Sequence, residues 1–232
     1  MTADLFDLSP QETEAIWLSL KVAGVATLAS CPAAILIAYI LARGRFFGHA
    51  ALNAVAHLPL VLPPVVTGYA LLLLFGRRGP LGAFLADHFG LVFAFRWTGA
   101  ALAAAVMSFP LLIRPMRLSF ENIDPRLPKA ARSLGARPFA AFVLVELPLA
   151  LPGIITGAVL GFAKALGEFG ATITFVSNIP GETRTIPAAI YSFMQTPDGD
   201  QGALRLSLIA VAIAVAALVV SEALQRRAGA RS

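Results

Sequence analysis

Long apolar runs separated by short polar segments make up most of the chain. Between Lys21 and Arg43 lie 21 uncharged residues, which extend about 31 Å as an α-helix and match the hydrocarbon core of a bilayer. Four further apolar runs cover residues 50–76, 96–114, 149–176 and 203–224. The pattern predicts an all-α integral membrane protein with about five transmembrane helices, in a single domain over residues 1–232.

Prolines interrupt the first two runs. Pro32 falls near the middle of the first run, where its missing amide hydrogen predicts a kink. Pro59, Pro63 and Pro64 all fall within residues 50–76. We therefore expect the second run to be a bent or broken span.

The ends of the runs indicate how they lie in a membrane. Trp97 begins the third run, as an interface anchor does. Arg205 is close to the start of the fifth, and its long side chain is expected to snorkel towards the nearer surface. Segments 76–96 and 177–202 connect the spans on one side, and residues 186–194 are predicted to form a short helix against the membrane.

Composition agrees with a membrane protein. The chain is 58% hydrophobic and 13% charged, whereas about a quarter of the residues in a soluble domain are charged. Cys31 is the only cysteine, which excludes an internal disulfide and a cysteine metal cluster. Residues 1–14 contain four acidic and no basic residues, unlike the basic start of a cleavable signal. We expect them to form an external acidic tail.

Basic residues are divided unequally between the two sides that these spans define. Eleven fall on one side and four on the other, apart from two at span ends. Lysine and arginine near membrane spans concentrate in the cytoplasm, so the N-terminus is predicted outside and the C-terminus inside. This orientation accounts for the net charge of +5 without a nucleic-acid partner. The eleven are Arg43, Arg45, Arg114, Arg117, Arg126, Lys129, Arg132, Arg137, Arg226, Arg227 and Arg231; the four are Arg77, Arg78, Arg96 and Arg184; the two are Lys21 and Arg205.

Residues 120–148 form the cytoplasmic segment between the third and fourth spans. Asp124 and Pro125 are typical of a helix start, and Gly135 of a helix end in the left-handed conformation. Leu127, Ala131 and Leu134 fall on one face of this short helix, with Ala130 beside them. A second helix is predicted from Pro138 back to the membrane. By themselves, these residues also fit an ordinary loop helix on the membrane surface.

The same segment resembles the "EAA" signature of permease subunits in ATP-driven importers: Glu-Ala-Ala, three residues, Gly, nine residues, Ile-x-Leu-Pro. Lys129 replaces the leading glutamate and Val145 stands for isoleucine. The resemblance implies a cytoplasmic coupling helix that docks into an ATPase and transmits its movement. The coupling residues it identifies are Pro125, Leu127, Lys129, Ala130, Ala131, Leu134 and Gly135.

The sequence contains none of the common motifs for nucleotide binding or hydrolytic catalysis. No lysine follows a glycine, so the Gly-x4-Gly-Lys-Ser/Thr phosphate loop does not occur. Zinc-hydrolase and serine-nucleophile motifs do not occur either. We therefore expect no catalytic, cofactor or metal site here, and expect ATP and magnesium to be bound by a separate ATPase.

Polar residues within the apolar runs are the candidates for a substrate path. Lys164 and Glu168 each cost about 2.5–3.5 kcal/mol at the centre of a membrane helix unless paired or hydrated. Four residues apart in one helix, they share a face and can pair. The pair either holds helices together or lines a water-filled path. Pro63, Pro64 and Thr67 offer a second candidate, where unwound backbone either lines a cavity or forms a packing kink.

Four further motifs are similar to the permease subunits of molybdate importers. They are Leu-Gly-Glu-Phe-Gly-Ala-Thr at 166–172, Asn-Ile-Pro-Gly-Glu-Thr-Arg-Thr at 178–185, Leu-Pro-Pro-Val-Val at 62–66 and Gly-Arg-Arg-Gly at 76–79. The start of the first is shared with sulfate permeases, whereas the second favours molybdate, with tungstate as a companion. The similarity covers nearly all of residues 58–222.

This resemblance implies the type I transmembrane fold of ATP-binding-cassette (ABC) importers, in a bacterial inner membrane. Its partners are implied to be a second copy of the chain, two cytoplasmic ATPase subunits and a periplasmic molybdate-binding protein. A sulfate or thiosulfate permease remains the nearer alternative. An ion-coupled secondary transporter is the more distant one.

Overall fold

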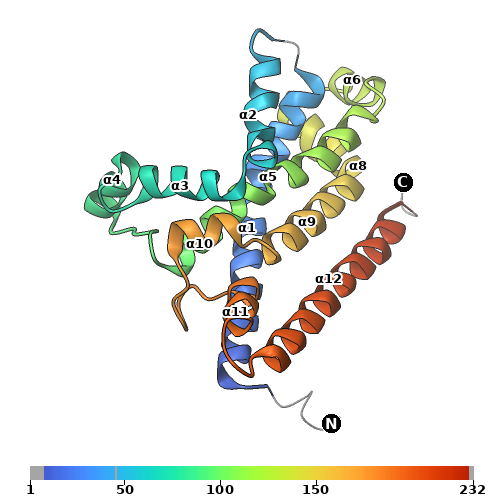
Figure 1. Ribbon diagram of the computed structural model, residues 1–232. Coiled ribbons are helices and arrows are strands. Elements are labelled where there is room, and N and C mark those ends of the chain that lie inside the picture. The colour runs from blue at the N-terminus through green and yellow to red at the C-terminus, as the bar shows by residue number, and fades with distance from the viewer. Residues whose placement is uncertain (1–7, 45, 230–232) are drawn as a thin grey trace.

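The computed structural model describes residues 8–44 and 46–229, and within these ranges every regular element is helical (Figure 1). Residues 1–7, Arg45 and Arg231 lie outside the described residues. The elements are α1 (Pro10–Arg43), α2 (His49–Val61), α3 (Pro64–Phe75), α4 (Pro80–Phe89), α5 (Trp97–Glu121), α6 (Arg126–Ser133), α7 (Pro138–Ala141), the π-helical turn η1 (Phe142–Glu146), α8 (Leu147–Leu149), α9 (Leu151–Leu166), α10 (Gly170–Val176), α11 (Ile186–Phe193) and α12 (Asp200–Gly229).

The number of spans agrees with the prediction. Helices α1, α5 and α12 are long and apolar enough to cross a membrane. If each of two bent pairs is counted as one span, the total rises to 5: α2 with α3, bent by 112°, and the α7–α8 segment with α9, bent by 67°. The predicted break of the second run is confirmed, because α2 ends before Pro63 and α3 starts at Pro64.

Helix α1 begins earlier than expected. Ser9 accepts a hydrogen bond from the amide of Glu12, and the Glu12 carboxylate accepts one from the amide of Ser9, which forms a capping box. Residues 10–14 are therefore helical, and the expectation of a tail through residue 14 is wrong for them. Glu12, one of the four acidic residues that suggested a tail, instead forms part of the cap of the helix.

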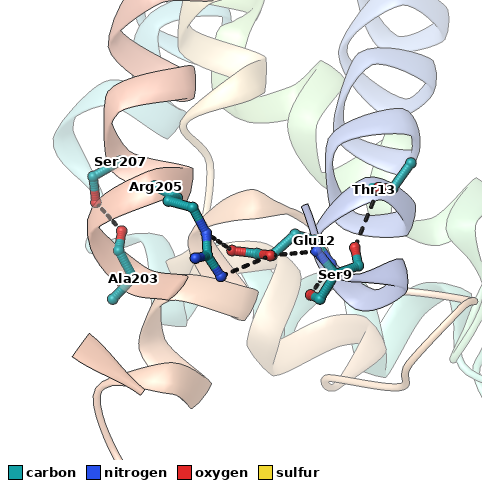
Figure 2. A network of polar contacts seen from close by, with 6 residues as sticks. All are labelled: Ser9, Glu12, Thr13, Ala203, Arg205 and Ser207. Carbon is teal, nitrogen blue, oxygen red and sulfur yellow. Dashed lines mark hydrogen bonds and ion pairs between the residues drawn. The ribbon is translucent and has the colours of Figure 1, made fainter. Parts of the chain in front are cut away.

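Arg205, predicted to be able to snorkel, pairs with a carboxylate of the protein itself. Its guanidinium donates from Nε to Glu12 Oε1 at 2.9 Å and from Nη2 to Oε2 at 3.1 Å (Figure 2). The Glu12 side chain is fully buried at the contact between α1 and α12. Because the Glu12 carboxylate neutralises the guanidinium inside the protein, the Arg205 side chain does not need to extend to water.

The fourth run is not one continuous helix. Helix α9 ends at Leu166, residues 167–169 are not helical, and α10 continues from Gly170. Helix α10 then packs against α3, which extends sideways from the helices around α1 together with α4 (Figure 1). The third run also differs from expectation, because α5 continues past Arg114 to Glu121, where Arg117 and Glu121 form an ion pair one turn apart.

Small residues allow close packing at the centre of the molecule, where α5 lies against α1 and α9. A Cβ added at Gly157 of α9 would lie 2.5 Å from the Leu112 carbonyl oxygen of α5. Gly153 and Gly161, one turn to each side, are equally close to α5. This small-xxx-small pattern is the packing device that membrane helices use for close approach.

The two ends of the molecule differ. The start of α1 and α11 lie together at one end, and α6 lies near the other end of α1 (Figure 1). The predicted short helix at 186–194 is confirmed as α11. Its Ile186 amide donates to Ser19 Oγ at 2.6 Å, which anchors it to α1.

Candidate functional site

The ends of α6 follow from local sequence. Asp124 Oδ1 accepts the amide of Arg126 at 2.9 Å, and the helix starts one residue later than predicted. At the other end, Gly135 has φ +95°, a conformation that costs glycine little. The Gly135 amide donates to the Arg132 carbonyl, and the Ala136 amide to the Ala131 carbonyl, each at 3.0 Å. These bonds form a Schellman turn, so the predicted left-handed end is confirmed.

Helix α6 projects from the protein with an apolar face exposed. None of its residues is buried, and Leu127 and Leu134 are 46% and 90% exposed. Ala130 lies between them on the same face. Leucines held this far out, on a helix too short to be stable alone, form a surface suited to binding another protein.

A buried carboxylate joins the base of α6 to α1. Glu146 of η1 accepts hydrogen bonds from the Tyr39 hydroxyl at 3.0 Å and from Arg43 Nε at 3.2 Å. Arg43 also donates to the Ile123 carbonyl at 3.2 Å, just before α6. Sequence reasoning missed Glu146, although a single carboxylate in the apolar stretch 142–149 was a signal for it. The contacts link the position of α6 to the end of a membrane-spanning helix.

The second candidate site lies at the break between α9 and α10. Lys164 Nζ and Glu168 Oε2 are 2.6 Å apart, and Glu168 Oε1 accepts the Ala171 amide at 3.0 Å. The Glu168 side chain is 1% exposed and that of Lys164 is 31% exposed. The predicted ion pair is confirmed. The predicted common helix face is wrong, because α9 ends before Glu168, whose side chain instead accepts an amide from the first turn of α10.

The other path candidates lie beside this break. A Cβ added at Gly170 would lie 2.7 Å from Cβ of Pro64, so the starts of α10 and α3 are in contact. Thr67 is buried, and its Oγ1 has no hydrogen-bond partner among the described residues. The fold thus gathers Pro63, Pro64, Thr67, Lys164 and Glu168 around two helix interruptions.

The described residues contain no group of three or more His, Cys, Asp or Glu side chains that would hold a metal ion. The contacts that the two sites show are charge pairing, hydrogen bonding and apolar contact. Such sites suit binding and conformational change.

Known proteins resemble this chain along nearly its whole length. It is 58% identical to the "Molybdenum transport system permease protein ModB" of Escherichia coli strain K12, over 94% of this chain and 96% of that protein. It is 35% identical to the "Sulfate transport system permease protein CysT" of Salmonella typhimurium strain LT2, over 96% of this chain and 80% of that protein.

Solved structures with low sequence identity share its fold. A bacterial ABC transporter that imports the acidic polysaccharide alginate matches with a TM-score of 0.75 and 19% identity, over 97% of this chain and 82% of that one. The alginate transporter in complex with its pentasaccharide-bound periplasmic protein matches with a TM-score of 0.72 and 18% identity, over 97% and 81% of the chains. The chain therefore has the predicted transmembrane fold of type I ABC importers.

The sequence profile described as "Binding-protein-dependent transport system inner membrane component" matches residues 32–231. That match includes α6 and the break between α9 and α10, the two candidate sites. The chain belongs to this family of inner membrane transport components.

Proposed function

We propose that this chain is the membrane permease subunit of an ABC importer that carries molybdate, and tungstate as a companion, into the cytoplasm. The observation that carries the proposal is the exposed face of α6, with Leu134 90% exposed. This face supplies a contact point for an ATPase at the end of the molecule away from α11. The spans behind it supply a path that opens alternately to each side.

The choice of cargo rests on the relatives. The 58% identical protein is named for molybdenum transport, whereas the 35% identical one is named for sulfate transport. The four motifs quoted from the sequence support the same choice. Sulfate or thiosulfate is the second candidate cargo, because it is also a tetrahedral oxyanion and the sulfate relative covers 96% of this chain.

Two copies of the chain, two cytoplasmic ATPase subunits and a periplasmic binding protein make up the proposed complex. The family description names dependence on a binding protein, and the alginate transporter is seen with one. ATP and magnesium are bound by the ATPases in this proposal, because the present sequence contains no phosphate-binding loop.

Movement passes from nucleotide to cargo through α6. When the ATPases close on ATP, each α6 moves with the subunit that holds it. The Glu146 contacts transmit this movement to α1 through Tyr39 and Arg43, so the spans tilt and the path between them opens outward. Hydrolysis separates the ATPases and reverses the movement.

The membrane orientation follows from charge. The excess of basic residues on the α6 side supports an external N-terminus and a cytoplasmic C-terminus. The loop before α11 would then receive the binding protein outside the cell. Its hydrogen bonds support a defined shape: Thr183 Oγ1 accepts the Ile179 amide at 2.8 Å, and Arg184 Nε donates to Asn178 Oδ1 at 3.0 Å.

The decisive test is uptake by vesicles that contain the purified complex with ATP inside. We expect concentrative uptake of radiolabelled molybdate that requires ATP, the ATPase and the binding protein. Tungstate should compete strongly and sulfate weakly. Uptake of sulfate that resists excess molybdate would favour the sulfate alternative, and uptake by this chain alone under an ion gradient would favour a secondary transporter.

A further inference from the structure

A cavity of about 390 Å³ lies between α6, the end of α1 and the α7–η1 segment, with charged and apolar residues in its lining. Its polar lining comes from the end of α1, from α6 and from η1: Tyr39, Arg43, Lys129, Arg132 and Glu146. Lys129 and Arg132 are three residues apart and therefore neighbours on the helix surface. Helix α6 thus has an apolar face and a basic face, and both are exposed.

The positive charge of this cavity is not balanced within the described chain. Glu146, its one carboxylate, is already held by Arg43 and Tyr39. The side chains of Lys129 and Arg132 make no ion pair or hydrogen bond with any described residue. Both are exposed.

The acidic side chains near this cavity already bind other groups. The carboxylate of Asp124 caps α6, and that of Glu121 is 2.7 Å from Arg117. Two unpaired cations therefore share one recess, and a carboxylate from outside the chain would accept hydrogen bonds from both.

We propose that this cavity receives an aspartate or glutamate side chain of the ATPase subunit against which α6 docks. The inference rests on the proposed function and adds the chemistry of the partner. The coupling signature that this chain resembles begins with a glutamate, and here Lys129 occupies that position. Because Lys129 and Arg132 are both cations without a counter-charge in the described residues, the complementary group on the ATPase is acidic.

Charge reversal in the assembled complex tests the proposal. We expect Lys129→Glu to lower cargo-stimulated ATPase activity and transport roughly tenfold or more, because two carboxylates would then meet at the interface. A Lys substitution at one acidic residue of the ATPase should restore both activities. Arg126→Glu is the matched control, since Arg126 lies on α6 outside the cavity lining and should change activity far less.

A third variant, Leu134→Asp, tests docking through the apolar face of α6 independently of the acidic partner. If Leu134→Asp uncouples the complex while Lys129→Glu behaves like Arg126→Glu, the acidic partner is refuted and docking through α6 stands. If none of the three variants changes coupling, docking through α6 itself fails. An effect of Lys129→Glu that occurs only in vesicles with anionic lipid would assign the cavity to a lipid phosphate and overturn the proposal.

Discussion

Glu12 and Arg205, 193 residues apart, join the first and last membrane helices by two charged hydrogen bonds (Figure 2). The side chains are 0% and 16% exposed. Only 11% of the apolar window of α12 is buried, and the helix contacts α9 and α11 as well as α1. The ion pair therefore fixes the start of α12 against α1.

Removing one partner of this pair should destabilise the protein. In Glu12→Gln, Arg205 loses the charge of its partner Glu12, and breaking a buried ion pair costs up to about 3–5 kcal/mol. We expect a clearly lower Tm of the purified protein in detergent. Glu121→Gln, which breaks the exposed pair with Arg117, is the control and should cost about 1 kcal/mol or less. Equal losses in the two variants would contradict a structural role for Glu12.

The contact between α5 and α9 depends on Gly157. In Gly157→Ala, the new Cβ would lie 2.5 Å from the Leu112 carbonyl oxygen, and overpacking of this kind costs about 1–3 kcal/mol. Gly24→Ala in α1 is the control, because an added Cβ there has nothing within 4 Å and alanine favours a helix. Thermal unfolding of the two variants should give opposite shifts in Tm. A stabilised Gly157→Ala protein would show that the helices are not in close contact.

Glu168 pairs with Lys164 and also accepts the Ala171 amide, and two substitutions distinguish these two contacts. Glu168→Gln keeps an acceptor for the Ala171 amide but loses the charge that pairs with Lys164, whereas Glu168→Ala loses both. Because a helix cap contributes about 1 kcal/mol, we expect Tm to fall in the order wild type, Gln, Ala. Transport rates in proteoliposomes should follow the same order if the break must keep its shape. Identical transport by all three proteins would remove Glu168 from the path.

Gly135 controls how the chain leaves α6. Asparagine tolerates the left-handed conformation, whereas a β-branched residue does not. We therefore expect Gly135→Asn to keep transport, and Gly135→Val and Gly135→Glu to uncouple ATPase activity from cargo. Gly90, with φ +66° at the end of α4 and open space around it, is the matched control. If Gly90→Val uncouples the complex equally, the effect at Gly135 is not specific to docking.

Single cysteines test the proposed orientation. After Cys31→Ala, Asp87→Cys in α4 should react with a membrane-impermeant maleimide on intact cells. Leu134→Cys should react only after the membrane is opened. Both positions are exposed in the subunit, so a difference in labelling reports the side of the membrane. The reverse pattern would place α6 outside and exclude a cytoplasmic ATPase as its partner.

The sequence by itself determined those features that depend on neighbouring residues. The apolar runs predicted the spans, because length and hydrophobicity are local properties. Asp124 and Gly135 predicted the ends of α6, because capping uses backbone groups within one helical turn. The prolines at 59, 63 and 64 predicted the break between α2 and α3 for the same reason.

Only the tertiary structure decided which distant groups meet. Arg205 was expected to reach water, because no local pattern showed that Glu12 lies beside it. Glu146 went unnoticed until the fold placed Tyr39 and Arg43 around it, and the basic cavity beside α6 depends on that same contact. Partner choice for a buried charge depends on residues from separate helices, and these come together only when the helices pack.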